Sequence, residues 1–223
     1  MDAGFWHQRW VSEQIGFHQE QINPYLQRFW PALGLRAGTT VFVPLCGKSR
    51  DMLWLAEQGF GVLGVEVSPL AVEAFFAENE MCAVREERGA FEVWCGGAIS
   101  IWQGDYFDLA VDDLAGVGAV FDRAALVAMP GSLQGAYVEH LFAICPPGMR
   151  QLLVTLEYPQ AEMDGPPFSV GEAVVRRLYE PHAAVQRLLT EDVWSANPRF
   201  AQRGLSALNE NVYGIGEHAG GAG

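Results

Sequence analysis

The amino-acid sequence predicts a doubly wound α/β fold, in which a mostly parallel sheet lies between layers of helices. Between residues 39 and 158, short apolar runs alternate with amphipathic stretches of helical periodicity, which is the order typical of strand–helix–strand units. The apolar runs show little alternation with polar residues, as expected of strands that are buried on both faces.

The first two strand–helix pairs lie in the first half of the chain. An apolar run at 40–45 precedes an amphipathic stretch at 51–56. A second run at 62–67 is followed by Ser68 and Pro69, which predict a helix with a serine N-cap and a proline at its first position. These four elements form the expected start of the sheet.

Three more strands and a helix follow before residue 160. The expected strands cover residues 98–102, 117–121 and 152–156, and the expected helix covers residues 133–145. Pro166 and Pro167 mark a loop before another helix, whereas residues 181–223 show no clear pattern. We expect one domain overall, made of a helical N-terminal lid at 1–38, a main domain at 39–217 and a flexible tail at 218–223.

The composition excludes several classes of protein. The 223 residues include 14 Lys+Arg against 27 Asp+Glu, a net charge of −13, and half of them are hydrophobic. Such a chain folds around a core, and because Lys48 is its single lysine and its arginines are scattered, it has no basic stripe for nucleic acid. Without a long apolar run or an apolar signal core, we expect a cytoplasmic protein that enters no membrane. Because no heptad pattern occurs, we also expect a monomer.

The cysteines and histidines do not have the spacing of a metal site. The four cysteines form no Cys-x-x-Cys pair and the five histidines no His-x3-His pair, so we expect no metal and no disulfide. Cys46 lies in the loop after the first strand, but no partner for a nucleophilic cysteine is identifiable, which favours a packed thiol.

The loop after the first strand, residues 44–49, is the expected ligand site, because open parallel sheets bind ligands at the carboxyl ends of their strands. It fits neither of two phosphate-binding motifs. A P-loop needs a glycine five residues before Gly47, where this chain has Phe42, and a dinucleotide fingerprint needs three glycines where this turn has one.

An acidic residue at the end of the second strand suggests another ligand. Glu66 follows the loop by about 20 residues, where a carboxylate accepts hydrogen bonds from ribose hydroxyls. Asp105, near the end of the third strand, can accept from an adenine amino group while Tyr106 packs on the ring. Ribose binding without a phosphate cradle favours S-adenosylmethionine as the cofactor. The alternative for Glu66 alone is a solvated carboxylate at a strand end.

Several motifs along the chain resemble those of the thiopurine S-methyltransferase family, in its bacterial branch. The resemblance extends from Phe5 to about Tyr213 and is carried by these segments: Trp6-His-Gln-Arg-Trp10, Gly16-Phe-His18, Asn23-Pro24, Val43-Pro-Leu-Cys-Gly-Lys48, Asp51-Met52, Trp54-Leu-Ala56, Gly64-Val-Glu66, Asp122-Arg123, Leu153-Val-Thr-Leu-Glu-Tyr158 and Gly165-Pro-Pro-Phe-Ser-Val170. It implies a class I S-adenosylmethionine-dependent methyltransferase fold with a seven-stranded sheet and helices on both faces.

The resemblance also implies roles for individual residues. The implied cofactor contacts are Trp10, Leu45, Glu66, Arg123 and the adenine pair Asp105 and Tyr106, with Trp6 and Phe17 as lid aromatics. Substrate-side roles fall to Arg199, which is placed by its spacing from Tyr213, and to Phe168, in a loop that is either a substrate cover or a structural turn. For Trp6 and Trp10, which share one helical face, packing within the lid is the alternative.

The implied reaction is transfer of a methyl group to sulfur. The substrates are a thiopurine or another small aromatic or heterocyclic thiol, whose thiolate attacks the cofactor's methyl carbon in line. Arg123 is the candidate catalytic residue, because a guanidinium at this strand end either grips the cofactor's carboxylate or stabilises the thiolate. The alternatives are methylation of selenium or tellurium compounds for metalloid detoxification, and a non-enzymatic module that binds an adenosine ligand.

Overall fold

The computed structural model describes residues 3–216, which form two compact units that meet at Phe121 and Asp122. This boundary differs from that between the lid and the main domain expected from the sequence, a division that stays a prediction. The predicted flexible tail at 218–223 lies outside the described residues. No helix of the described chain is long and apolar enough to span a membrane.

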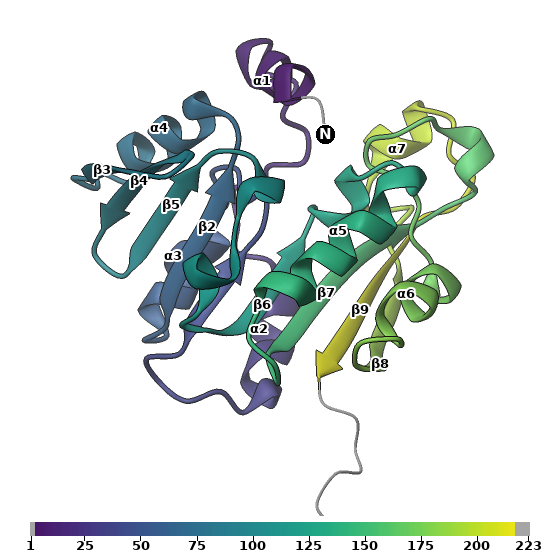
Figure 1. Cartoon of the computed structure of the whole chain (residues 1–223). Coiled ribbons are helices and arrows are strands. Elements are labelled where there is room, and N and C mark those ends of the chain that lie inside the picture. Colours follow the sequence, from purple (N-terminus) through teal and green to yellow (C-terminus); the bar gives the residue numbers. More distant parts are fainter. Residues whose placement is uncertain (1–2, 217–223) are drawn as a thin grey trace, which may run out of the picture. The chain divides into compact units, whose positions relative to one another are not determined.

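The first unit is built on a sheet with the strand order β3-β4-β5-β2-β1-β6 (Figure 1). Its strands are β1 (Thr40–Val43), β2 (Gly61–Glu66), β3 (Val84–Arg88), β4 (Phe91–Gly96), β5 (Ile99–Gln103) and β6 (Val117–Arg123), the last two residues of which belong to the second unit. Strand β1 pairs in parallel with β2 and β6, and β2 pairs in parallel with β5. The carboxyl ends of these four strands therefore lie on one edge of the sheet.

The helices of the first unit include the two that the sequence predicts after the first and second strands. They are α1 (Ala3–Val11), α2 (Pro24–Phe29), η1 (Trp30–Leu33), α3 (Asp51–Glu57), α4 (Pro69–Glu78), η2 (Tyr106–Asp108) and η3 (Val111–Leu114). Within the N-terminal extension expected at 1–38, the described residues are helical at 3–11 and 24–33. Helix α4 begins at Pro69 after Ser68, but the buried Ser68 side chain makes no capping hydrogen bond.

The second unit contains an antiparallel sheet with the strand order β7-β9-β8. Its elements are η4 (Leu126–Ala128), α5 (Gly131–Ile144), β7 (Arg150–Glu157), η5 (Gln160–Glu162), α6 (Glu172–Tyr179), β8 (Ala184–Asp192), α7 (Pro198–Gln202) and β9 (Asn209–Gly216). Helices α5 and α6 confirm the two helices predicted on either side of β7. The last two strands occupy the region in which the sequence showed no clear pattern.

The described residues contain nine strands, whereas the resemblance implied seven. The two additional strands are the hairpin β3–β4, which joins the sheet through antiparallel pairing of β4 with β5. Every residue of β3 is exposed. The guanidinium carbon of Arg85 lies 3.4 Å from the centre of the buried Trp94 ring on β4, so the outer strand is held by pairing and stacking rather than by burial.

Candidate functional site

The loop after β1, residues 44–50, turns sharply because two of its residues have left-handed backbone conformations. Leu45 has a φ of 47° and Gly47 a φ of 53°. A leucine in this region costs about 1–2 kcal/mol, and such local strain is concentrated at functional sites. The expected strand over 40–45 therefore ends at Val43, and the half-buried Leu45 lies in the turn. We name residues 44–50 the cofactor loop, after the ligand that the sequence predicts for it.

Glu66 links the cofactor loop to the start of α4. It is the last residue of β2 and only 6% exposed. One carboxylate oxygen accepts the Gly47 N–H at 2.9 Å and the other accepts the Ser68 N–H at 2.8 Å. Burial raises the pKa of Glu66 to about 6, although these amide hydrogen bonds oppose the shift. The Val67 N–H lowers the pKa as well, and the carboxylate still has acceptor capacity for a ribose hydroxyl.

Cys46, between Leu45 and Gly47, is a packed thiol. Its sulfur lies only 2.6 Å from the position that a Cβ atom on Gly64 would occupy. The thiol therefore fills the space beside this glycine of β2. Burial, with the nearby charge of Glu66, raises the pKa of the Cys46 thiol well above its ordinary value. The protonated thiol is a poor nucleophile, in agreement with the interpretation from the sequence.

The segment after β5 lies next to Glu66. The Gly104 N–H donates to the Glu66 carbonyl at 3.0 Å, and the half-buried Asp105 follows. The Asp105 carboxylate accepts the Phe107 N–H at 3.0 Å and thereby caps η2. The Tyr106 ring is 4% exposed and stacks on Phe42, with ring planes 12° apart. That Asp105 and Tyr106 contact adenine stays a prediction.

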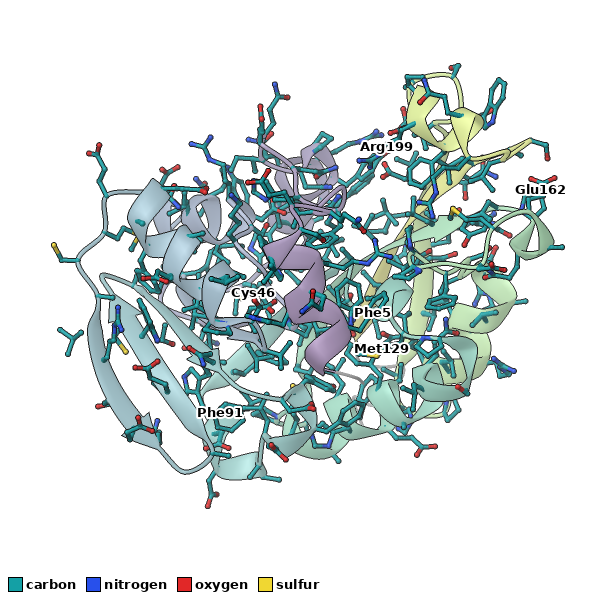
Figure 2. All side chains as sticks on the ribbon, turned by 90° about the horizontal axis from the view of Figure 1, so that it is seen from above. Phe5, Cys46, Phe91, Met129, Glu162 and Arg199 are labelled. Carbon is teal, nitrogen blue, oxygen red and sulfur yellow. The ribbon has the colours of Figure 1, made fainter. Side chains whose placement is uncertain are left out.

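Three aromatic residues of the N-terminal segment form one cluster. Trp6 and Trp10, both on α1, each pack edge-on against Phe17, with ring centroids 5.8 and 5.6 Å away. The Trp10 ring also lies close to the loop, because one of its atoms is 3.3 Å from the position that a Cβ atom on Gly47 would occupy. Figure 2 accordingly shows α1, which carries the labelled Phe5, beside the loop that contains Cys46. Of the predicted aromatics, Trp10 is placed directly on the cofactor loop.

In the second unit, Asp122 and Arg123 end β6 in different surroundings. Asp122 is fully buried, and its carboxylate accepts the Tyr137 hydroxyl at 2.7 Å and the Leu126 N–H at 3.2 Å. Burial raises the pKa of Asp122 to about 6 against the effect of these hydrogen bonds. Arg123 is half-buried. Because the Asp122 carboxylate is buried, Asp122 and Arg123 do not form an ion pair on the surface.

The two predicted substrate-side residues lie on neighbouring segments of the second unit. Phe168 is half-buried in the loop after η5, where its N–H donates to the Val127 carbonyl at 2.6 Å. Arg199 is exposed on α7, with its guanidinium 4.9 Å from the centre of the Phe200 ring. Figure 2 labels Arg199 and Glu162 on these segments.

The carboxylate of Glu162, on η5, connects the segment before Phe168 to the segment that follows α7. Glu162 accepts the Ser206 hydroxyl at 2.7 Å and the Ser206 N–H at 2.8 Å. These hydrogen bonds lower the pKa of Glu162. The segments also share a small apolar cluster made of Tyr158, Met163, Val193, Phe200, Leu205 and Leu208. The sequence showed no pattern for this packing because its members are far apart in the chain.

The sequence interpretation assigned no role to the buried carboxylate of Asp51. Asp51, at the first position of α3, is 2% exposed and accepts the Asn23 N–H at 2.7 Å. The only feature of the sequence that points to this role of Asp51 is Ser49, which precedes by two residues an acidic residue at the start of a predicted helix. The polar contacts of Asp51 join two segments that lie 28 residues apart.

The chain is similar to known proteins over nearly its whole length. The family model "Thiopurine S-methyltransferase (TPMT)" matches residues 1–218. A protein named thiopurine S-methyltransferase from Nitrosospira multiformis is 53% identical, covering 96% of this chain and 97% of its own. The protein of the same name from Pseudomonas entomophila is 50% identical, covering 96% and 98%.

Solved structures of low sequence identity share the fold. The 1,6-didemethyltoxoflavin-N1-methyltransferase of Burkholderia thailandensis, solved with S-adenosylhomocysteine, is 16% identical with a TM-score of 0.61, covering 97% of this chain and 87% of that one. A S-adenosylmethionine-dependent methyltransferase from Methanosarcina mazei has a TM-score of 0.62 at 12% identity, covering 88% and 99%. The fold is thus the α/β class I methyltransferase fold, and the chain belongs to the thiopurine S-methyltransferase family.

Proposed function

We propose that this protein is an S-adenosylmethionine-dependent methyltransferase that methylates the sulfur of thiopurines and of other small aromatic or heterocyclic thiols. The observation that carries the proposal is the family match over residues 1–218, together with relatives of 50% identity or more over nearly their whole length. When bound, S-adenosylmethionine supplies a methyl group on a positively charged sulfur, which a substrate thiolate removes by in-line displacement.

The residues of the first unit fit this cofactor. Glu66, at the end of β2, retains acceptor capacity for a ribose hydroxyl. Gly47 of the cofactor loop leaves room for the Trp10 ring. We propose that Leu45 and Trp10 line the same site, with Asp105 and Tyr106 at the adenine. Trp6 and Phe17 pack with Trp10 in the proposed lid over residues 1–38, where aromatic faces attract a sulfonium by about 0.5–2 kcal/mol.

The proposed roles of the second unit concern charge and substrate. Arg123, at the carboxyl end of β6, holds the cofactor's carboxylate or stabilises the attacking thiolate. Phe168 and Arg199 contact the thiol substrate. Most of the catalysis comes from holding sulfur and methyl group in line, which is worth about 7–11 kcal/mol when the alignment is good.

We further propose that the chain acts as a monomer in the cytoplasm, on a small molecule and without nucleic acid. The net charge of −13 opposes binding to phosphates. All four cysteines are free thiols, two of them buried, as is usual in a reducing compartment.

A methyl-transfer assay tests the proposed function. The protein is incubated with S-adenosylmethionine labelled in its methyl group and with a thiopurine, and the oxygen analogue of that purine serves as the matched control. We expect label on the thiopurine and none on the analogue. Binding of S-adenosylhomocysteine in calorimetry without transfer to any thiol would point to a binding module. A kcat/KM higher for selenite- or tellurite-derived species would point to metalloid methylation.

A further inference from the structure

The N-terminal segment, residues 3–23, contacts the cofactor loop and the start of α3 at three places. The Trp10 ring lies on Gly47, the Arg50 side chain donates to the Glu20 carbonyl at 3.2 Å, and the Asn23 N–H donates to Asp51 at 2.7 Å. All three contacts involve the cofactor loop or the residue that follows it. The segment is therefore fixed at its far end, through Trp10, and at its base, through Asn23.

Asp51 is the buried charge at this base. One carboxylate oxygen accepts the Asn23 N–H and the other accepts the Ser49 hydroxyl at 3.0 Å. The Ser49 oxygen in turn accepts the Asp51 N–H at 3.2 Å. Hydrogen bonds to a carboxylate are stronger than neutral ones, so Asp51 ties the base of the segment to the end of the cofactor loop.

The same loop reaches Glu66 at its other end. The Ser49 N–H donates to the Cys46 carbonyl at 3.1 Å, and the Gly47 N–H donates to Glu66 at 2.9 Å. A continuous path of hydrogen bonds and backbone thus leads from Asn23, through Asp51 and the loop, to Glu66. Displacing Asp51 would move both the base of the segment and the loop that Glu66 holds.

We propose that Asp51 is a positioning residue for cofactor binding, which sets the N-terminal segment so that Trp10 lies over Gly47 beside Glu66. This inference rests on the proposed function, because it takes S-adenosylmethionine and S-adenosylhomocysteine as the ligands. Asp51 itself contacts no reacting atom. Its effect reaches the ligand through Asn23 and Ser49.

The alternative is that Asp51 only stabilises the start of α3. A variant of another buried residue in that helix would then weaken ligand binding as much, provided it destabilises the fold equally. Leu55 is such a residue, because it is fully buried in α3. Its side chain is apolar, so shortening it removes packing and leaves the hydrogen bonds of Asp51 in place. Leu55→Ala is therefore the matched control.

The experiment measures S-adenosylhomocysteine binding by calorimetry for the wild type, Asp51→Ala, Asp51→Asn, Ser49→Ala and Leu55→Ala. We expect Asp51→Ala to raise the Kd by at least about tenfold, since two hydrogen bonds to a charged group are lost. Asp51→Asn keeps an acceptor oxygen, and Ser49→Ala removes the two hydrogen bonds between Ser49 and Asp51 but leaves the one from Asn23. Both variants should therefore raise the Kd less. Leu55→Ala should leave the Kd within about twofold of the wild type.

Kinetics and hydrogen exchange give the second readout. For Asp51→Asn, the KM for S-adenosylmethionine should rise while kcat at saturation and the KM for the thiol stay near wild type. Amides of residues 3–20 should exchange faster in Asp51→Asn than in Leu55→Ala when S-adenosylhomocysteine is present. If Asp51→Ala does not fold, Asp51→Asn and Ser49→Ala carry the test.

Two results would overturn the inference. One is an Asp51→Asn or Ser49→Ala protein that binds S-adenosylhomocysteine as tightly as the wild type. The other is an equal loss of binding in Leu55→Ala. Failure of the proposed function is distinguishable, because the wild-type protein itself would then bind no S-adenosylhomocysteine or transfer no methyl group.

Discussion

Glu66 holds the cofactor loop and the start of α4 with the same two oxygens that we propose accept hydrogen bonds from the cofactor's ribose. Each accepts one backbone N–H, from Gly47 or Ser68, and the side chain is almost fully buried. Its position at a strand end could be predicted from the sequence. Its hydrogen bond to Gly47 of the loop could not be predicted, because these two residues are 19 positions apart and come together only when β1 and β2 pair.

The raised pKa of Glu66 predicts a pH dependence of cofactor binding. Ribose hydroxyls donate to the charged carboxylate, so binding favours the ionised form. Because the pKa of Glu66 is about 6, the Kd for S-adenosylhomocysteine should be flat above pH 7 and rise by up to about tenfold per unit below pH 6. Calorimetry between pH 5 and pH 8 measures this. Glu66→Gln should bind at least about tenfold more weakly at pH 7.5 and show no such rise.

An equal pH dependence in Glu66→Gln would assign the titration to another group. Asp122, whose pKa is also about 6, is the first candidate, and Asp122→Asn separates the two. A Kd unchanged by Glu66→Gln at every pH would remove the ribose assignment.

Arg123 can act on the cofactor or on the substrate, and lysine distinguishes these roles because it keeps the charge but not the planar fork. If the guanidinium grips the carboxylate, Arg123→Lys should raise mainly the KM for S-adenosylmethionine. If it stabilises the thiolate, Arg123→Lys should keep much activity, whereas Arg123→Ala should lose activity most steeply at low pH, where the thiol is protonated. Steady-state kinetics from pH 6 to pH 9 measure both. Wild-type kinetics for Arg123→Ala would exclude both roles.

At the scale of the element, apolar runs predicted the strands with long buried stretches but missed the hairpin β3–β4 and the last two strands, β8 and β9. Strands β1, β2, β6 and β7 have long buried runs, and each was expected. In contrast, all of β3 is exposed and five residues of the hairpin are charged. Tertiary pairing decides such strands, because their own sequence does not favour burial.

The cofactor loop and α1 meet where a glycine allows it. Gly47→Ala would place a methyl group 3.3 Å from the Trp10 ring, in a left-handed conformation that disfavours alanine. Gly38→Ala is the matched control, since Gly38 is also left-handed but has nothing within 4 Å. In Gly47→Ala we expect faster amide exchange over residues 3–11 and less protection by S-adenosylhomocysteine. Hydrogen exchange with mass spectrometry measures both.

Gly38→Ala should introduce similar backbone strain and leave amide exchange in α1 unchanged. Equal exchange of α1 in the two variants would show that contact with Gly47 does not hold this helix. If S-adenosylhomocysteine protected residues 3–20 in neither the wild type nor the variants, the lid itself would be excluded.

At the scale of the whole molecule, the predicted site residues come from both units. Glu66 and Trp10 lie before the boundary at Phe121, and Arg123, Phe168 and Arg199 lie after it. Local spacing was enough for Glu66, which follows a recognisable strand. Arg199 needed the resemblance, because α7 has five residues and its packing on the loop near Glu162 uses contacts across more than 40 positions.

Buried acids also shape the stability of the whole chain. In the folded protein the pKa of Asp122 is about 6, against an ordinary value of 3.8, so folding favours its protonated form. Below pH 3.8 the group has no net effect. As pH rises from there through 6, the unfolded chain ionises first and the folded state loses stability. Above pH 6 the full loss is about 3 kcal/mol.

This sign gives a prediction for Asp122→Asn, which is neutral at every pH. Between pH 7.5 and pH 5, the wild type should gain about 1 kcal/mol of unfolding free energy relative to Asp122→Asn, a shift of about 2–4 °C in Tm. Glu162→Gln is the control, because the pKa of Glu162 is lowered from 4.5 and its difference from the wild type should stay constant over this range. Thermal unfolding of the three proteins at both pH values measures these differences. If the wild type and Asp122→Asn changed in parallel, the carboxylate would already be ionised in the folded protein at pH 5, and Asp122 would contribute no pH dependence between the two pH values.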